Sequence, residues 1–113
     1  MKTIEKNLKA EYFDKIKDGS KTIELRLFDE KRQQINLNDT IFFNKEPEKT
    51  EQIKVNVAGL LRYNSFQDLL KDFGMEYFGE NSKEELLSNL QVFYARSAQE
   101  KDGVLGIKVR LVN

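Results

Sequence analysis

The segment Gly19-Ser20-Lys21-Thr22-Ile23-Glu24-Leu25-Arg26 combines a turn glycine with three charged side chains in and just before a predicted β-strand. Apolar and polar residues alternate along it, so Ile23 and Leu25 face one side of the strand, and Glu24 and Arg26 face the other. The apolar side predicts a core. The charged side has two interpretations: a solvent-exposed face with an ion pair between Glu24 and Arg26, or the floor of a polar cleft.

The residues before this strand have the spacing of a helix. Between Ala10 and Asp18, Tyr12, Phe13 and Ile16 share one helical face. Gly19 follows at the position where a left-handed backbone commonly ends a helix. We therefore expect a helix that leads directly into the charged strand.

The rest of the chain alternates short strands with short helices. Segments of alternating or β-branched residues predict strands, S-x-x-D/E sequences predict helix starts, and most connections between strands are too short for right-handed βαβ crossovers. These features favour an α+β fold, a small mixed β-barrel of about five or six strands with short helices around it. The expected strands include 1–8, 22–27, 40–43, 53–63 with a bend at Gly59, and 105–111, and the expected helices begin at Ser65, Ser82 and Ser97.

Length and composition indicate one globular domain, residues 1–113, with 39% hydrophobic and 34% charged residues. The chain has no His and no Cys, which removes the commonest metal ligands, so we predict neither a metal nor a cofactor. Lys plus Arg and Asp plus Glu both number 19, so a nucleic-acid partner would need a local basic patch. Glu5 and Lys6 interrupt the N-terminus and no apolar run is long enough for a membrane span, so we expect a cytoplasmic protein without a membrane partner.

The spacing G-x-K-x-x-E-x-R from Gly19 to Arg26 resembles the motif of the ASCH domain family, small proteins of the PUA-like superfamily. The helix before Gly19 is similar to the family's opening helix, and residues 35–43 and 103–107 resemble its turn and its closing strand. The resemblance covers nearly the whole chain. One departure is Asn38, which stands where the family usually has glycine, and asparagine tolerates the left-handed region better than most residues.

The resemblance implies a barrel with a cleft that receives RNA or a nucleotide. In such a cleft Lys21 supplies a mobile cation, Arg26 a planar fork for phosphate or a base edge, and Glu24 an acceptor for an exocyclic amine. Lys21 is two residues from Ile23, so in a regular strand it would face the apolar side. It can therefore join Glu24 only from the turn or across a bulge. Replacing Lys21 and Arg26 with alanine is expected to weaken ligand binding and to leave thermal unfolding nearly unchanged. Further candidate ligand contacts, each of which could equally be structural, are Arg62, Tyr63, Tyr94 and Arg96.

Two other functions remain open. Some members of the family are amidohydrolases that deacetylate acetylcytidine with a lysine, a threonine and a distant glutamate. Lys21 matches the lysine, but Glu24 occupies the threonine position and would have to activate water instead. The distant glutamate could be Glu76, Glu80, Glu84 or Glu85. A protein-interaction or regulatory module is the third interpretation, because it is consistent with a net charge of zero and with exposed aromatic residues.

Overall fold

A computed structural model describes residues 1–112, and its elements confirm the predicted α+β fold. The described part of the chain contains five strands, four α-helices and two short 3₁₀ helices. In chain order they are β1 (Thr3–Leu8), α1 (Ala10–Lys17), β2 (Ile23–Leu27), η1 (Arg32–Gln34), β3 (Thr40–Lys45), β4 (Gln52–Tyr63), α2 (Phe66–Asp72), η2 (Met75–Tyr77), α3 (Lys83–Phe93), α4 (Arg96–Asp102) and β5 (Val104–Leu111).

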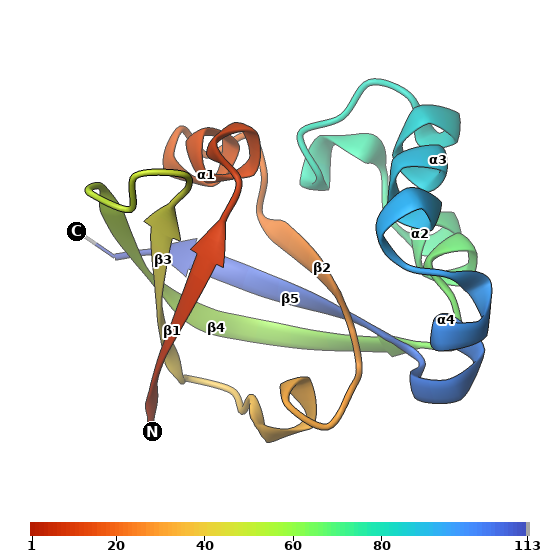
Figure 1. Cartoon of the computed structure of the whole chain (residues 1–113), viewed down its shortest axis with the longest axis horizontal. Coiled ribbons are helices and arrows are strands. Elements are labelled where there is room, and N and C mark those ends of the chain that lie inside the picture. Colours follow the sequence, from red (N-terminus) through yellow and green to blue (C-terminus); the bar gives the residue numbers. More distant parts are fainter. Residues whose placement is uncertain (113) are drawn as a thin grey trace.

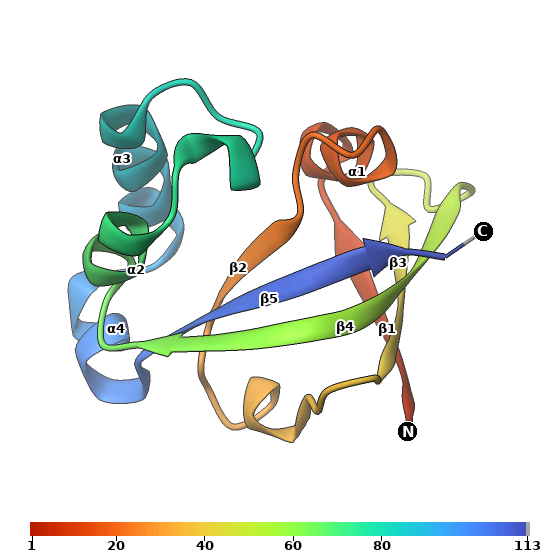
Figure 2. The same cartoon turned by 180° about the vertical axis from the view of Figure 1, so that it is seen from behind.

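The strands form one mixed sheet in the order β1-β3-β4-β5-β2. The β1–β3 pair is parallel and the other three pairs are antiparallel. The sheet curls strongly, and β1 and β2 are its two edges, so the predicted barrel is a half-barrel that stays open between these strands (Figure 1). Figures 1 and 2 show α2, α3 and α4 gathered on one side, beyond β2, and α1 at a separate position near the ends of β1 and β3.

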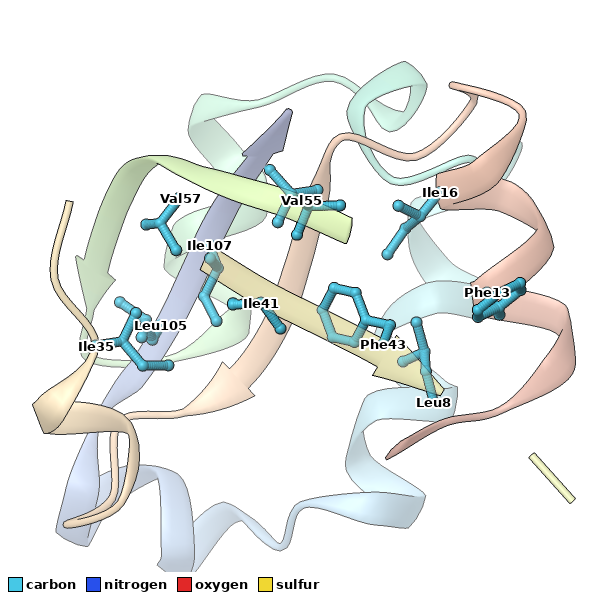
Figure 3. Close-up of a cluster of buried hydrophobic side chains, with 11 residues drawn as sticks. Leu8, Phe13, Ile16, Ile35, Ile41, Phe43, Val55, Val57, Leu105 and Ile107 are labelled. Carbon is cyan, nitrogen blue, oxygen red and sulfur yellow. The ribbon is translucent and has the colours of Figure 1, made fainter. Parts of the chain in front are cut away.

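Two apolar clusters stabilise this arrangement. The first fills the inside of the half-barrel and includes Phe13, Phe43 and Ile107 (Figure 3). The second lies between the outer face of β2 and the helices, and Ile23 and Leu25 belong to it. The apolar face of β2 therefore points outward to the helices, and its charged face points into the half-barrel. This corrects the interpretation of the charged face as a solvent-exposed surface.

Two backbone positions restrict which residue can occupy them, Gly59 through lack of space and Asn38 through its left-handed conformation. The register of β4 against β5 shifts between Val57 and Gly59, which confirms the predicted bend. A Cβ on Gly59 would lie only 2.8 Å from Cδ of Lys108, so a side chain there would force a rearrangement. Asn38 has a φ of 70°, the left-handed conformation in which the sequence comparison expects glycine.

Helix starts follow the predicted caps at two of three places. Ser65 and Ser82 each accept a hydrogen bond from the backbone N–H three residues later. The prediction for Ser97 was wrong, because α4 already begins at Arg96 and has Ala95 at its N-cap. The buried Gln99 side chain instead bonds backbone groups at the start of α2 and the end of α3, and this tertiary contact positions the helix.

Candidate ligand-binding site

The turn after α1 brings Lys21 to the charged strand. Gly19 has a φ of 87°, and the Lys21 backbone donates a hydrogen bond to the carbonyl of Lys15 at 3.0 Å. Lys21 also forms an isolated β-bridge with Phe78 ahead of β2. Its side chain is only 5% exposed, and its Nζ lies 3.1 Å from Oε1 of Glu24. The turn, and not a bulge, thus brings the Lys21 side chain to the side of β2 that carries Glu24.

Glu24 is the centre of a buried network, with only 4% of the residue exposed. Oε1 contacts Lys21 Nζ and accepts a hydrogen bond from the backbone N–H of Leu25 at 3.3 Å. Oε2 accepts from Nε of Arg26 at 2.9 Å and lies 2.8 Å from its Nη2. A carboxylate has about four lone-pair sites, and these contacts with Lys21, Leu25 and Arg26 occupy them. The contacts assign Glu24 to holding the two cations and do not favour the exocyclic amine or the catalytic water of the sequence analysis as its partner.

Electrostatics favours the charged forms of Glu24 and Arg26. Burial by itself would raise the pKa of Glu24, but the charges and hydrogen bonds of Lys21 and Arg26 outweigh burial and place it below its ordinary value. Burial likewise opposes the charge of Arg26, and the Glu24 carboxylate reverses that effect and raises the Arg26 pKa. One carboxylate therefore faces two cations, which leaves an excess of positive charge beside the half-barrel interior.

The burial of this network changes one expectation from the sequence. Replacing Lys21 and Arg26 together with alanine would leave Glu24 buried without either of its cations. A buried charge without a partner costs several kcal/mol, on the order of 3–5. We therefore expect a marked change in thermal unfolding, in place of the nearly unchanged stability expected from the sequence.

A pocket of about 170 Å³ adjoins the network. Its walls come from the end of β1, from the middle of β2, from α1, from α3 and from the loop after β3, so it lies between the two edge strands on the open side of the half-barrel. Nζ of Lys21 lies 4.7 Å from the centre of the Tyr12 ring, which forms one wall. The residues that line the pocket are Asn7, Leu8, Lys9, Tyr12, Lys21, Glu24, Leu25, Arg26, Glu46, Leu86, Leu90, Phe93 and Tyr94.

Of the other candidate contacts, only Tyr94 lines this pocket. Its ring packs against Phe66 with centroids 5.5 Å apart. Arg96 follows two residues later, but its side chain is 89% exposed and lies 3.6 Å from a carboxylate of its own helix. The guanidinium of Arg62 stacks over the ring of Phe28 at 4.1 Å, away from the pocket. Tyr63 lines the same separate surface as Arg62.

The carboxylate that completes the pocket wall is Glu46, which the sequence analysis did not single out. It lies in the loop between β3 and β4, and no motif marks it. Glu80 pairs with Lys15 at 3.3 Å. None of the four glutamates considered from the sequence lines the pocket: Glu76, Glu80, Glu84 and Glu85. Tyr12 was expected on the core face of a helix together with Phe13. Phe13 is buried there, whereas Tyr12 is only partly buried and lies at the rim.

Two negative findings concern residues 1–112. No helix in this part of the chain is both long enough and apolar enough to cross a membrane. Within the same residues, no group of three His, Cys, Asp or Glu side chains is arranged to hold a metal ion.

Comparison with known proteins identifies the family. The crystal structure of the hypothetical protein PH0355 matches with a TM-score of 0.85 and 38% identity over 97% of this chain and 99% of that chain. The solution structure of PF0455 from Pyrococcus furiosus matches with a TM-score of 0.76 and 34% identity over 98% of both chains. No curated protein matches. The family model of the ASCH domain matches residues 7–113, so the chain belongs to the ASCH domain family, which is generally linked to RNA binding.

Proposed function

We propose that the protein binds a nucleotide, either free or as an unpaired residue of RNA, with the base in the pocket beside Glu24. The observation that carries this proposal is the buried Lys21–Glu24–Arg26 network, which presents two fixed cations to a pocket with aromatic walls. Charged groups held in a preformed apolar pocket are typical of ligand sites. The link of the family to RNA supports the same class of ligand.

The size of the pocket favours one ring system. Its volume of about 170 Å³ is below the roughly 300–1,000 Å³ typical of sites for drug-sized ligands. Tyr12 and Tyr94 offer aromatic surfaces to it, and unpaired bases stack on such side chains. A single base therefore fits the pocket better than a whole nucleotide or a duplex.

The polarity of the pocket favours a base with acceptor atoms. A guanidinium carries five N–H groups, and two of those of Arg26 are directed at Glu24, which leaves three. The Lys21 ammonium also has more N–H donors than its contact with Glu24 uses. Carbonyl oxygens of a pyrimidine are suitable partners for these donors.

The substitution Arg26→Lys tests this role of the guanidinium. Lysine keeps the positive charge but loses the planar fork, so binding of cytidine monophosphate should weaken about tenfold, or about 1.4 kcal/mol, with the protein still folded. NMR titration of wild type and variant with cytidine monophosphate and with a short unpaired RNA measures the effect and distinguishes free nucleotide from RNA.

The matched control is Arg96→Lys, because Arg96 carries the same side chain outside the pocket. Its affinity for either ligand should equal that of wild type. If millimolar nucleotide and RNA leave the amide shifts of the pocket residues unchanged in wild type, nucleotide binding is wrong and a protein-interaction module becomes the better interpretation.

A second candidate function, hydrolysis of acetylcytidine or another acylated nucleoside, is favoured by Glu46. Glu46 lines the pocket and, among residues 1–112, forms no ion pair. Unlike Glu24, it is not held by two cations, so it is the candidate general base for a water molecule. If this reaction occurs, Glu46→Gln should lower acetate release at least about 100-fold, and Gln substitution of the exposed Glu30 should not change it. Absence of acetate release from acetylcytidine by the wild type would exclude the candidate.

A further inference from the structure

A second cluster of cations lies next to the network, and we call Lys6, Lys31 and Arg32 the cationic cluster. Lys6 comes from β1, and the other two come from the segment after β2. Lys6 is partly buried and lines a small void together with Glu24, Arg26 and Arg32. Burial and the neighbouring charges of Arg32, Lys31 and Arg26 lower the pKa of Lys6 to about 8. The cluster is therefore an unfavourable arrangement of like charges in the absence of an anion.

Few carboxylates compensate these cations. Nη1 of Arg32 lies 3.0 Å from Oδ2 of Asp29, which is its ion-pair partner. Within residues 1–112, neither Lys6 nor Lys31 forms an ion pair. Nε of Arg32 is buried and has no hydrogen-bond partner in the described part of the chain. An anion at this place would thus meet both unpaired charge and an unpaired donor.

The pocket and the small void beside the cationic cluster share two lining residues. Arg26 and Glu24 line both the pocket and the small void that Lys6 and Arg32 line. Tyr94 also lines the pocket, and its pKa is raised by burial while the charges of Arg26 and Arg32 oppose that increase. The pocket and the cluster therefore adjoin the same two side chains, which is the basis for assigning them to one ligand.

We propose that Lys6, Lys31 and Arg32 bind the phosphate of the nucleotide whose base occupies the pocket. This rests on the proposed function and adds the substrate class: a phosphorylated nucleotide is bound in preference to the free nucleoside. The pocket is too small for a whole nucleotide, so the phosphate must lie outside it. The net charge of the chain is zero, so the protein as a whole supplies no field that would attract phosphate without such a local cluster.

Paired titrations with cytidine and cytidine monophosphate test the proposal. Wild type should bind the monophosphate about tenfold more tightly, because charge-assisted hydrogen bonds to phosphate are strong. In Lys6→Gln this preference should fall to about one, and the affinity for cytidine should stay as in wild type. Lys83→Gln, at an exposed position in α3, is the matched control and should keep the full preference.

The outcomes separate the two proposals. If cytidine binds in the pocket and the monophosphate binds no more tightly, the phosphate site is wrong and the proposed function stands. If neither of these ligands binds and a short unpaired RNA does not bind either, both proposals are wrong. An equal loss of affinity for both ligands in Lys6→Gln would also overturn the phosphate site, because it would indicate a structural role for Lys6.

A pH series provides an independent readout. Lys6 faces Glu24 and Arg26 of β2 and Lys31 and Arg32 of the following segment, and its pKa is lowered to about 8. Between about pH 7 and pH 9, on either side of this value, Lys6 should lose its proton, and the preference for the monophosphate should fall with it. Lys6→Arg should keep the preference for the monophosphate that Lys6→Gln loses. In this variant the preference should not fall up to pH 9, because a guanidinium stays protonated. A preference that is independent of pH in wild type would contradict a contribution of Lys6 to phosphate binding.

Discussion

Replacing Glu24 with alanine should lower the free energy of unfolding by about 3–5 kcal/mol, the cost of breaking a buried ion pair from one side. Lys21 and Arg26 would remain largely buried without the carboxylate that both now contact. For a domain of this size the midpoint of thermal unfolding should fall by roughly 10–20 °C. Thermal and urea unfolding followed by circular dichroism measure the change.

Glu30→Ala is the control for this prediction, because Glu30 is exposed and forms no ion pair within residues 1–112. Its stability should stay within about 0.5 kcal/mol of wild type. A loss of less than about 1 kcal/mol in Glu24→Ala would mean that water solvates the network and that it is not truly buried.

The same network predicts a loss of stability in acid. The pKa of Glu24 is lower in the folded protein than its ordinary value, so the unfolded chain binds the proton more readily. The contribution of ionised Glu24 to the free energy of unfolding is complete above the ordinary carboxyl pKa. It is lost as the pH falls through the lower pKa that Glu24 has in the folded protein. The difference in stability between wild type and Glu24→Ala should therefore narrow in acid.

The triple substitution Lys21→Met, Glu24→Leu and Arg26→Met should restore stability and abolish binding. Apolar side chains of similar volume need no desolvation, and replacing a buried ionic network in this way is often neutral or stabilising by about 1–4 kcal/mol. The pocket would lose its cationic donors, so binding of cytidine monophosphate should weaken at least about 100-fold. Unfolding curves and the same NMR titration measure both quantities on one protein.

Comparison of the single and triple variants separates function from fold. A stable triple variant that no longer binds nucleotide would show that the network serves ligand recognition at the expense of stability. A triple variant as unstable as Glu24→Ala would show instead that the fold needs the ionic contacts. Full binding by a stable triple variant would exclude this pocket as the nucleotide site.

Parts of the fold and site were predictable because they depend on residues that are close in sequence. The alternation around Ile23 placed Glu24 and Arg26 together on one face of β2, and the serine caps at Ser65 and Ser82 marked two helices. The cap predicted at Ser97 failed because the distant contacts of Gln99 position α4. Local signals are reliable where no tertiary contact competes with them.

The sequence by itself determined the family motif, the strand and helix pattern and the joint position of Glu24 and Arg26, since neighbouring residues control backbone conformation and side-chain parity. Only the tertiary structure decided that the charged face of β2 points into the half-barrel, because both faces of this strand are covered, one by the core and one by helices. It also brought Lys6 and Glu46 from distant segments to the Glu24–Arg26 pair, Lys6 at the small void and Glu46 at the pocket, since curling of the sheet places its two edge strands close together.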